Sequence, residues 1–370
     1  MSYIDSDVLT GKSTGTNIIK VDIPEKISTM KKMNILVTGG AGYVGSVLIP
    51  SLIEEGHFVK CLDRFFFGDE FLSSKKFEGN LELIQDDIRW FKPEILNNVD
   101  AVIDLAALSN DPVGNLDPKK TFEINHLGRV RVANLSKKAK VPRYILASSA
   151  SIYGQQDKVV DETSEVFPLT VYSKANRQAE IDNLKLNDDD FCVTVLRFSS
   201  LYGVSPRMRF DISVNSMVLE LFKNRKIIVR GKNNSRPFLH IRDAVTAYKK
   251  TLYSERKHIS GEIFNVGSEE QNFKIGNLAK EIIDSINIDC ELELGNTNDH
   301  RSYITSFEKI RKIMQFSPSL TLSDGAREIY DALKNKQITD SEKTITLKWY
   351  NQILNDPKLF KSFSINGTVL

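Results

Sequence analysis

The sequence has few of the residues on which disulfide-rich and metal-binding proteins depend. Only 3 of its 370 residues are cysteine, and no two of them form a CxxC pair. Cys61 and Cys192 lie in apolar, strand-like runs and Cys290 stands apart, so we expect reduced thiols, the first two buried as small hydrophobic side chains. The 5 histidines are spread without ligand spacing and no Ser-His-Asp order is visible, so neither a metal site nor a catalytic triad is predicted.

The chain also lacks an excess of one charge and a long apolar run. Its 50 basic and 48 acidic side chains leave a net charge of +2, which gives no electrostatic basis for binding nucleic acid or an anionic membrane surface. No apolar stretch is long enough to span a bilayer, and the polar, acidic start is unlike a signal peptide. With 41% hydrophobic and 26% charged residues, the composition predicts a soluble, cytoplasmic protein with a large core.

Strand-like and helical segments alternate from residue 34 onward. Residues 1–33 show no periodicity, and we expect a loose extension or a sequence whose real start lies near Met33. Strand-like runs recur at NILVTGG, HFVKCLD, LELIQ, AVIDLAA, RYILASSAS and FCVTVLRFS, and the clearest helical spacing between them covers residues 121–140. This alternation predicts right-handed βαβ units and a Rossmann-type doubly wound parallel sheet over residues 34–204.

The alternation loosens after residue 204. Short strands at 226–230, 262–267 and 291–295 mix with helices near 277–287 and 322–335. We predict a smaller, mixed α/β substrate-binding domain over residues 205–340, partly interleaved with the first, and a C-terminal helix and tail over 341–370. Because ligands of open α/β sheets bind at the carboxyl ends of the strands, the cleft between the two domains is the expected site.

The segment TGGAGYVG directly follows the first strand and opens a helix. Gly39, Gly42 and Gly45 have GxxGxxG spacing, and glycines there let the backbone turn tightly and approach a pyrophosphate at the helix N-terminus. The segment lacks the Gly-Lys-Ser/Thr ending of a P-loop. We therefore predict a dinucleotide-binding turn that also includes Tyr43 and Val44.

Asp63 ends the second strand, 24 residues after Gly39. A carboxylate there would accept hydrogen bonds from an adenosine ribose and repel a 2′-phosphate, which favours NAD over NADP. The neighbouring Arg64 keeps NADP open, because an arginine is able to pair with that phosphate. The remaining predicted cofactor contacts follow the third and fourth strands: Asp86, Asp87, Ile88, Leu105, Ala106 and Ala107.

Six motifs, in order, resemble those of a known family. GxxGxxG, DLAA, INHLGRVRVAN, SSASIYG, PLTVY and RPFLHIRDA are similar, over roughly residues 34–335, to those of the extended short-chain dehydrogenase/reductases, specifically the NAD-dependent nucleotide-sugar epimerase/dehydratase family. The resemblance implies an enzyme that binds NAD in the larger domain and a nucleotide-activated sugar in the smaller one. It also implies a homodimer formed through helices that include residues 121–134 and the helix of Tyr172.

The resemblance assigns the catalytic residues. Tyr172 would take a proton from a sugar hydroxyl, Ser149 would hydrogen-bond the same oxygen, and Ser151 would assist. A phenol has a pKa of about 10, so it needs positive charge nearby to act as a base at neutral pH. The family's lysine stands four residues after the tyrosine, where this chain has the uncharged Asn176, which is placed to hydrogen-bond the nicotinamide ribose. Lys174 comes only two residues after Tyr172 and is expected on another face of the helix.

Two departures from the family pattern leave alternatives open. The 4,6-dehydratases carry an Asp-Glu pair after the active hydroxyl residue, where this chain has Ala150 and Ser151. We therefore disfavour 4,6-dehydration and predict epimerisation through a transient keto intermediate, with a dehydrogenase or a 4-ketosugar reductase as the alternative. The missing lysine keeps open a non-catalytic NAD(H)-binding regulatory protein.

The resemblance also implies residues for the substrate. Arg236 and Arg301 are placed like the arginines that bind the diphosphate of the sugar nucleotide, a task suited to guanidinium. Arg207 and Arg209 lie near the same predicted mouth, and Asn215 is placed to touch a phosphate or a base.

Two polar residues have a structural alternative. Asn125 matches the family asparagine whose position supports the active-site helix, and it is also assigned as a cofactor contact, although a plain helix–helix hydrogen bond is an equal alternative. His240 is expected to be structural, in a strand that runs into a helix with Asp243 near its start.

Overall fold

The computed structural model of the chain describes residues 31–297 and 299–370. The loose extension predicted for residues 1–33 therefore falls almost entirely outside the described residues. The first strand begins at Asn34, where the sequence pattern changes.

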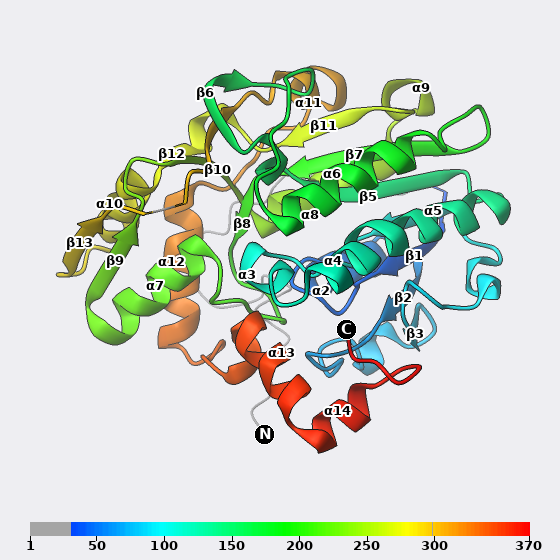
Figure 1. Ribbon diagram of the computed structural model, residues 1–370, viewed down its shortest axis with the longest axis horizontal. Helices are drawn as coiled ribbons and strands as arrows, with labels where there is room; N and C mark the ends of the chain where they lie inside the picture. The colour runs from blue at the N-terminus through cyan, green and yellow to red at the C-terminus, as the bar shows by residue number, and fades with distance from the viewer. Residues whose placement is uncertain (1–30, 298) are drawn as a thin grey trace.

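A seven-stranded parallel sheet forms the larger part of the molecule (Figure 1). Its strands follow the order β11-β7-β5-β4-β1-β2-β3, and each neighbouring pair is parallel. Their bounds are β1 (Asn34–Thr38), β2 (Phe58–Asp63), β3 (Leu81–Gln85), β4 (Ala101–Asp104), β5 (Arg143–Ser149), β7 (Cys192–Phe198) and β11 (Ile263–Val266). The predicted doubly wound fold is confirmed, and the strand order reverses between β1 and β4, where such folds bind ligands.

Helices cover both faces of this sheet. One face packs against α2 (Gly45–Glu54) and α8 (Ile241–Tyr253), and the other packs against α5 (Arg129–Lys138) and α6 (Val171–Leu184). Burial on both faces explains why the strands read as nearly continuous apolar runs. Cys61 and Cys192 lie inside this core as free thiols, as the sequence predicts.

The helix predicted over residues 121–140 is present but contains a π-helical turn. It runs through α4 (Pro118–Phe122), the π segment η4 (Glu123–Gly128) and α5. Such π turns occur mostly within α-helices and often at functional sites. A side chain at Gly128 would lie 2.8 Å from Ile88, so this helix packs closely on the loop after β3. The buried side chain of Arg129 reaches the Asp104 carbonyl at the carboxyl end of β4, and that of Asn125 bonds Leu108 in the loop that follows.

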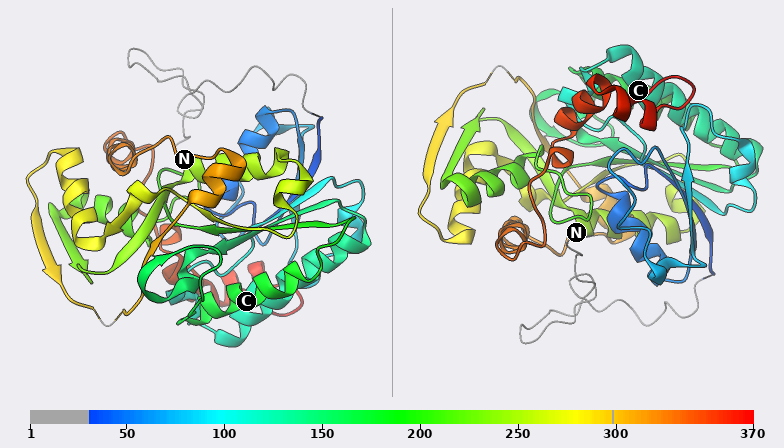
Figure 2. Two further views of the ribbon diagram at one scale, coloured as in Figure 1. Left: turned by 90° about the horizontal axis from the view of Figure 1, so that it is seen from above. Right: turned by 90° about the horizontal axis from the view of Figure 1, so that it is seen from below.

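A smaller lobe lies beside the carboxyl ends of the strands, as the views in Figure 2 show. Its core joins α7 (Ser213–Asn224), α10 (Ile275–Ile286) and α12 (Leu322–Lys334) with paired strands β9 (Lys226–Arg230) and β13 (Glu291–Gly295). A three-stranded sheet of β8 (Ser200–Tyr202), β10 (Ser235–His240) and β12 (Asn272–Lys274) connects it to the rest.

One strand belongs elsewhere than the sequence suggests. The run at 262–267 was assigned to the smaller domain, but its strand β11 extends the large sheet beside β7. Phe264 and Val266 are fully buried there and belong to the core of the large sheet, so burial of their apolar side chains stabilises this pairing. The chain therefore returns to the large sheet after the smaller lobe has begun, with α8 and then β11.

The C-terminal segment forms two helices, α13 (Thr346–Asn355) and α14 (Pro357–Phe363), rather than the predicted single helix and tail (Figure 1). Trp349 and Tyr350 pack against Phe66 and Val113, and the Trp349 indole donates to the Phe66 carbonyl at 2.6 Å. The remaining short elements are η2 (Lys75–Phe77), η3 (Pro93–Leu96), α3 (Asp111–Gly114), η5 (Ala150–Tyr153), β6 (Gln155–Val160), α9 (Arg256–Ile259), η6 (Glu269–Gln271), β14 (Ser302–Thr305), α11 (Glu308–Met314) and η7 (Glu342–Thr344).

A buried ion pair ties α6 to the large sheet. Arg197 of β7 donates to both carboxylate oxygens of Glu180, at 3.0 and 2.9 Å, and both side chains are almost fully buried. Ser148 of β5 donates to the same carboxylate at 2.6 Å. Arg177 reaches it from the exposed side, at 3.0 Å. This network sets the position of α6 against β5 and β7.

We expect Arg197→Met to lower the free energy of unfolding by about 3–5 kcal/mol, because it leaves the Glu180 carboxylate buried without its main partner. Arg177→Met is the matched control: it removes a partly exposed arginine from the same carboxylate and should cost about 1 kcal/mol or less. Urea denaturation of both variants measures the difference. Equal costs would show that the buried pair does not hold α6.

Candidate active site

A cavity of about 660 Å³ opens at the carboxyl ends of the large sheet and is closed on its other side by the smaller lobe. It brings together nearly all the side chains that the sequence predicts for a site. Those that line it are Gly39, Gly42, Tyr43, Val44, Gly45, Asp63, Arg64, Asp86, Asp87, Ile88, Leu105, Ala106, Ala107, Ser149, Ser151, Tyr172, Asn176, Arg207, Arg209, Arg236 and Arg301.

Two predicted residues, Asn125 and Asn215, lie behind the wall of the cavity instead. The Asn125 amide bonds both backbone groups of Leu108, at 2.8 and 3.0 Å, so its partner is a loop and not a ligand. The Asn215 amide accepts from the Gly203 N–H at 3.1 Å and donates to the Arg209 carbonyl at 2.8 Å. Both amides are fully buried and already hydrogen-bonded, so we correct their assignment from ligand contacts to supports.

The glycine turn after β1 has the close approaches that a dinucleotide requires. Gly39 has φ +66°, and a Cβ there would lie 2.8 Å from the Ala106 backbone. A Cβ at Gly45 would lie 2.4 Å from the Gly40 carbonyl oxygen. Side chains at these positions would fill the cradle or push β1 from β4. The turn therefore fits a pyrophosphate at the N-terminus of α2.

The acidic residue at the end of β2 is held in place by the turn. The Asp63 carboxylate accepts from the Ala41 and Phe65 N–H groups, at 3.0 and 2.8 Å. Burial raises the pKa of Asp63, and these backbone N–H groups oppose the rise. Asp63 lines the cavity at the end of β2, and its contact with a ribose stays a prediction.

Arg64 is committed to protein partners. Its guanidinium pairs with Asp87 at 2.6 Å and donates to the carbonyls of Phe363 and Thr368, in the segment that follows α13. Burial acts to raise the pKa of Asp87, but Arg89 and Arg64 outweigh it and leave that pKa lowered. Arg64 is thus bonded to protein groups and not available to pair with the 2′-phosphate of NADP, which favours NAD.

The predicted catalytic side chains lie together at the base of the cavity. Tyr172 stands in the first turn of α6, which is capped by the Thr170 side chain, and Ser149 ends β5. The Ser149 and Ser151 hydroxyls are 2.9 Å apart. Burial raises the pKa of Tyr172 above its ordinary value; the charge of Arg129 opposes this rise most strongly, and a hydrogen bond from Ser149 also lowers it.

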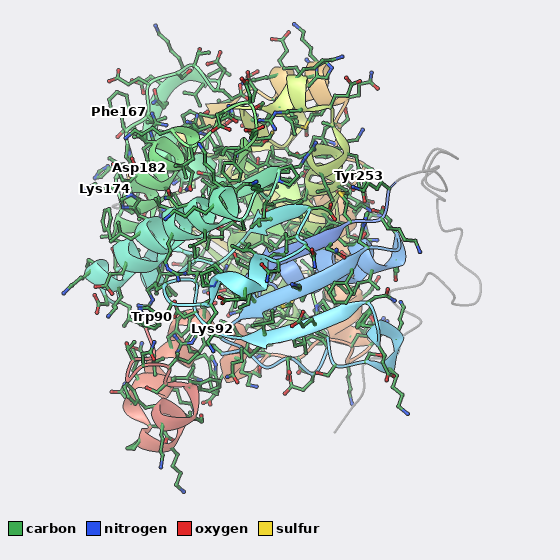
Figure 3. The ribbon with its side chains drawn as sticks, turned by 90° about the vertical axis from the view of Figure 1, so that its right-hand side faces the viewer. Trp90, Lys92, Phe167, Lys174, Asp182 and Tyr253 are labelled. Atoms are coloured by element: carbon green, nitrogen blue, oxygen red, sulfur yellow. The ribbon has the colours of Figure 1, made fainter. Side chains whose placement is uncertain are left out.

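Asn176 lies one helical turn after Tyr172 and is almost fully buried. Its amide donates to the Tyr172 carbonyl at 3.0 Å and accepts from the Arg129 guanidinium at 2.9 Å. Lys174 is exposed on the outward side of α6, beside Asp182 (Figure 3). The only lysine close to Tyr172 in sequence therefore points away from the cavity, as expected.

Three of the four predicted substrate arginines face carboxylates. Arg209 pairs with Asp211 through two hydrogen bonds of 2.8 and 3.1 Å. Arg301 pairs with Asp299 through bonds of 2.8 and 2.6 Å, and also with Asp111 from the larger lobe. Arg236 lies 3.5 Å from the same Asp299 and 5.0 Å from the centre of the Tyr303 ring.

Arg207 differs from the other three. It stacks 3.6 Å above the centre of the Phe67 ring and donates to Thr346, but two of its buried guanidinium nitrogens have no hydrogen-bond partner. Burial and the charge of Arg209 lower the pKa of Arg207 to about 9. A buried cation with free donors in a cavity wall fits an anionic ligand.

Several residues that line the cavity were missed by the sequence analysis. They are Phe67, Asp111, Arg129, Asp211, Tyr248, Tyr303, Tyr350, Val369 and Leu370. Arg129 had a usable signal, because it lies four residues after Asn125 and so on the same helix face. The C-terminal residues had none, since only the fold brings them to β2.

Among the described residues, no set of three or more His, Cys, Asp or Glu side chains is arranged to hold a metal ion. No helix within residues 31–297 and 299–370 has both the length and the apolarity needed to traverse a membrane.

Comparisons with known proteins agree with this geometry. The profile of the NAD dependent epimerase/dehydratase family matches residues 35–267. UDP-glucuronic acid decarboxylase 1 of Arabidopsis thaliana is 26% identical over 84% of this chain and 72% of its own length. A putative UDP-glucose 4-epimerase of Methanocaldococcus jannaschii is 26% identical over 82% of this chain and all of its own.

Solved structures share the fold. A UDP-glucuronic acid 4-epimerase from Bacillus cereus, in complex with UDP-glucuronic acid and NAD, superimposes with a TM-score of 0.74 at 23% identity, covering 82% of this chain and 100% of that one. The family match confirms the predicted resemblance, the enzyme class and NAD as the cofactor. The individual roles of the site residues stay predictions.

We expect Gly39→Ala to weaken NAD binding by about tenfold or more, because its Cβ would collide with the Ala106 backbone and deform the turn. Gly79→Ala is the control: Gly79 also has a positive φ, +81°, but a Cβ there meets nothing within 4 Å and lies away from the cavity. Calorimetric titration with NAD compares the two variants. Unchanged affinity in folded Gly39→Ala would place the cofactor elsewhere.

Proposed function

The chain belongs to the NAD dependent epimerase/dehydratase family, and from this premise we propose that it epimerises a nucleotide-activated sugar through a transient keto intermediate. One observation carries the proposal. Tyr172 and Ser149 line the same cavity as the glycine turn after β1 and the four predicted substrate arginines. This arrangement supports a proton-transfer role for Tyr172 beside a bound cofactor and an anionic substrate.

In the proposed mechanism, bound NAD supplies the acceptor and donor of a hydride. The glycine turn, Asp63 and Ala106 would hold it. Tyr172, as phenolate, removes the proton of a sugar hydroxyl, and Ser149 hydrogen-bonds the same oxygen. NAD, when bound, would supply hydride acceptance and return at the sugar carbon, which is the chemistry that inversion through a ketone needs. Tyr172 would hold the hydroxyl proton during the oxidation and give it back on reduction.

The proposed substrate is a UDP-activated hexose or hexuronic acid. The curated relatives and the B. cereus structure are named for UDP-sugars, which supports this nucleotide. Arg207, with two guanidinium nitrogens that have no hydrogen-bond partner, is proposed as a donor to phosphate oxygens of a bound ligand. We propose that residues 34–204 mainly hold NAD and that residues 205–340 mainly hold the sugar nucleotide, with Arg236 and Arg301 near the diphosphate.

Other reactions that begin with the same oxidation of the sugar are the alternatives to epimerisation. The relatives include decarboxylases, in which the reaction ends with loss of CO₂. A net dehydrogenase or a 4-ketosugar reductase would use the same base without inversion. Ala150 and Ser151 follow the active serine, so the carboxylate pair of a 4,6-dehydratase is absent at these positions.

Assembly and location also belong to the proposal. We propose a homodimer formed through η4, α5 and α6, because Leu127 of η4 is 56% exposed and Phe167, just before α6, is 45% exposed on the same outer side as Lys174 (Figure 3). Light scattering should give twice the mass of the chain. The buried free thiols Cys61 and Cys192 support a reducing compartment such as the cytoplasm.

The reaction is tested by incubating the purified protein with UDP-glucuronic acid and UDP-glucose in deuterated buffer and following the sugars by NMR. An inverted sugar without net NADH supports the proposal. Loss of CO₂ would make the protein a decarboxylase, and accumulated keto sugar with stoichiometric NADH would make it a dehydrogenase. Bound NAD without any change of sugar would contradict epimerisation of these substrates.

We expect Tyr172→Phe to lower kcat by about a hundredfold or more, because it removes the general base. Since burial raises the pKa of Tyr172, the wild-type rate should rise with pH as the phenolate forms. Tyr202→Phe is the control, because that hydroxyl is buried outside the cavity on Gln271, at 2.7 Å. Steady-state rates across pH decide the matter, and a fully active Tyr172→Phe would remove the tyrosine from the mechanism.

A further inference from the structure

Tyr172 needs a nearby positive charge if it is to act as a base. A buried phenol has its pKa raised, and it acts as a base near neutral pH only if a positive charge stabilises the phenolate. The position one turn after Tyr172, where the family resemblance implies a lysine, holds the neutral Asn176. Lys174 is exposed on the far side of α6. A positive charge supplied by the protein would therefore come from another element.

We propose that Arg129 of α5 supplies this charge to Tyr172 and that Asn176 is the residue that positions it, an inference that rests on the proposed function. Arg129 is 1% exposed, yet it lines the cavity beside Tyr172 and Asn176. The positive charge beside Tyr172 thus comes from α5, whereas the family resemblance implies a lysine on α6.

The contacts of Arg129 fix its guanidinium. One terminal nitrogen donates to the Asn176 side-chain oxygen at 2.9 Å. The other donates to the carbonyls of Asp104, at 3.1 Å, and Ala147, at the carboxyl ends of β4 and β5. Three elements thus hold the cation where the strands open into the cavity.

The nearest carboxylate approaches Arg129 at a different nitrogen from Asn176. Asp104 lies 3.8 Å from the Arg129 Nε, and its oxygens also accept from Thr38 at 2.5 Å and from Tyr144. The Asp104 carboxylate lies at the guanidinium's Nε, whereas the Asn176 amide bonds one of its terminal nitrogens. Of all the groups around Tyr172, Arg129 lowers its pKa most.

The other charged or titratable groups that face Tyr172 are weaker sources of positive charge than Arg129, or none at all. Asp111 of α3 is negative and raises the pKa of Tyr172. Arg209, before α7, is paired with Asp211 through two hydrogen bonds. Tyr248 of α8 and Tyr303 of β14 are buried phenols with raised pKa values, so they carry no positive charge.

The arginine at position 129 accounts for the asparagine at position 176. The Asn176 amide is both an acceptor for Arg129 and a donor to the Tyr172 carbonyl. A lysine has three donors and no acceptor, so at position 176 it would leave Arg129 without that bond and place a second cation against it. A chain with arginine at 129 therefore requires a neutral acceptor at 176.

The first test is Asn176→Asp, which keeps the shape of the side chain and its acceptor but adds a negative charge that neutralises Arg129. We expect the titration of the Tyr172 phenol, followed by ultraviolet difference absorbance against Tyr172→Phe, to move to higher pH. The rate near pH 7 should fall by about tenfold with little change in KM. Asn183→Asp, the same change at a buried position farther along α6, is the control and should move neither.

The second test relocates the charge. Arg129→Gln alone should raise the phenol titration like Asn176→Asp, and Asn176→Lys alone should reduce activity because two cations meet. The double variant Arg129→Gln/Asn176→Lys should recover both the wild-type rate and the wild-type phenol titration. An unmoved titration in folded Asn176→Asp, or a double variant worse than both single ones, would overturn the proposal. The titration needs no sugar, so it decides the role of Arg129 even if the proposed reaction fails.

Discussion

The buried guanidinium of Arg129 is the interaction on which the rest of the site depends. Its hydrogen bonds go to the carbonyls of Asp104 in β4 and Ala147 in β5, and to the side chain of Asn176, one helical turn after Tyr172. Such a cation costs free energy to bury, and this cost is offset only because every contact comes from a fixed backbone or a held amide. The same contacts set the distance between α5, α6 and the mouth of the sheet.

The distribution of charge along the cavity follows a consistent pattern. At the cofactor end, Arg64 and Asp87 neutralise each other, and Asp63 is held by backbone N–H groups. At the far end, Arg209 and Arg301 are each bound to a carboxylate. Among the four predicted substrate arginines, Arg207 differs in having buried donors without hydrogen-bond partners. An arginine that is paired with a carboxylate is held in a fixed position in the cavity wall. An arginine with unbonded donors can instead form favourable hydrogen bonds with a bound anion.

The sequence was sufficient for the features that depend on local patterns. Apolar periodicity located six of the seven strands of the large sheet in their domain, and the glycine spacing located the turn at Gly39. It failed where long-range packing decides. β11 joins β7 because Phe264 closes the large core, and the C-terminal residues reach Arg64 through a return of the chain. Asn125 and Asn215 were placed in the correct regions, but whether an amide faces a ligand or a backbone is a matter of a few ångströms.

A crystal structure with NAD and a UDP-sugar bound is the measurement that tests the central claim most directly. We predict that the reacting sugar hydroxyl lies within hydrogen-bonding distance of both the Tyr172 and Ser149 hydroxyls, and that the cofactor's nicotinamide end packs beside Asn176, with the bond between Asn176 and Arg129 intact. A sugar that binds away from Tyr172, or an Arg129 side chain that leaves Asn176 for another partner, would contradict the account.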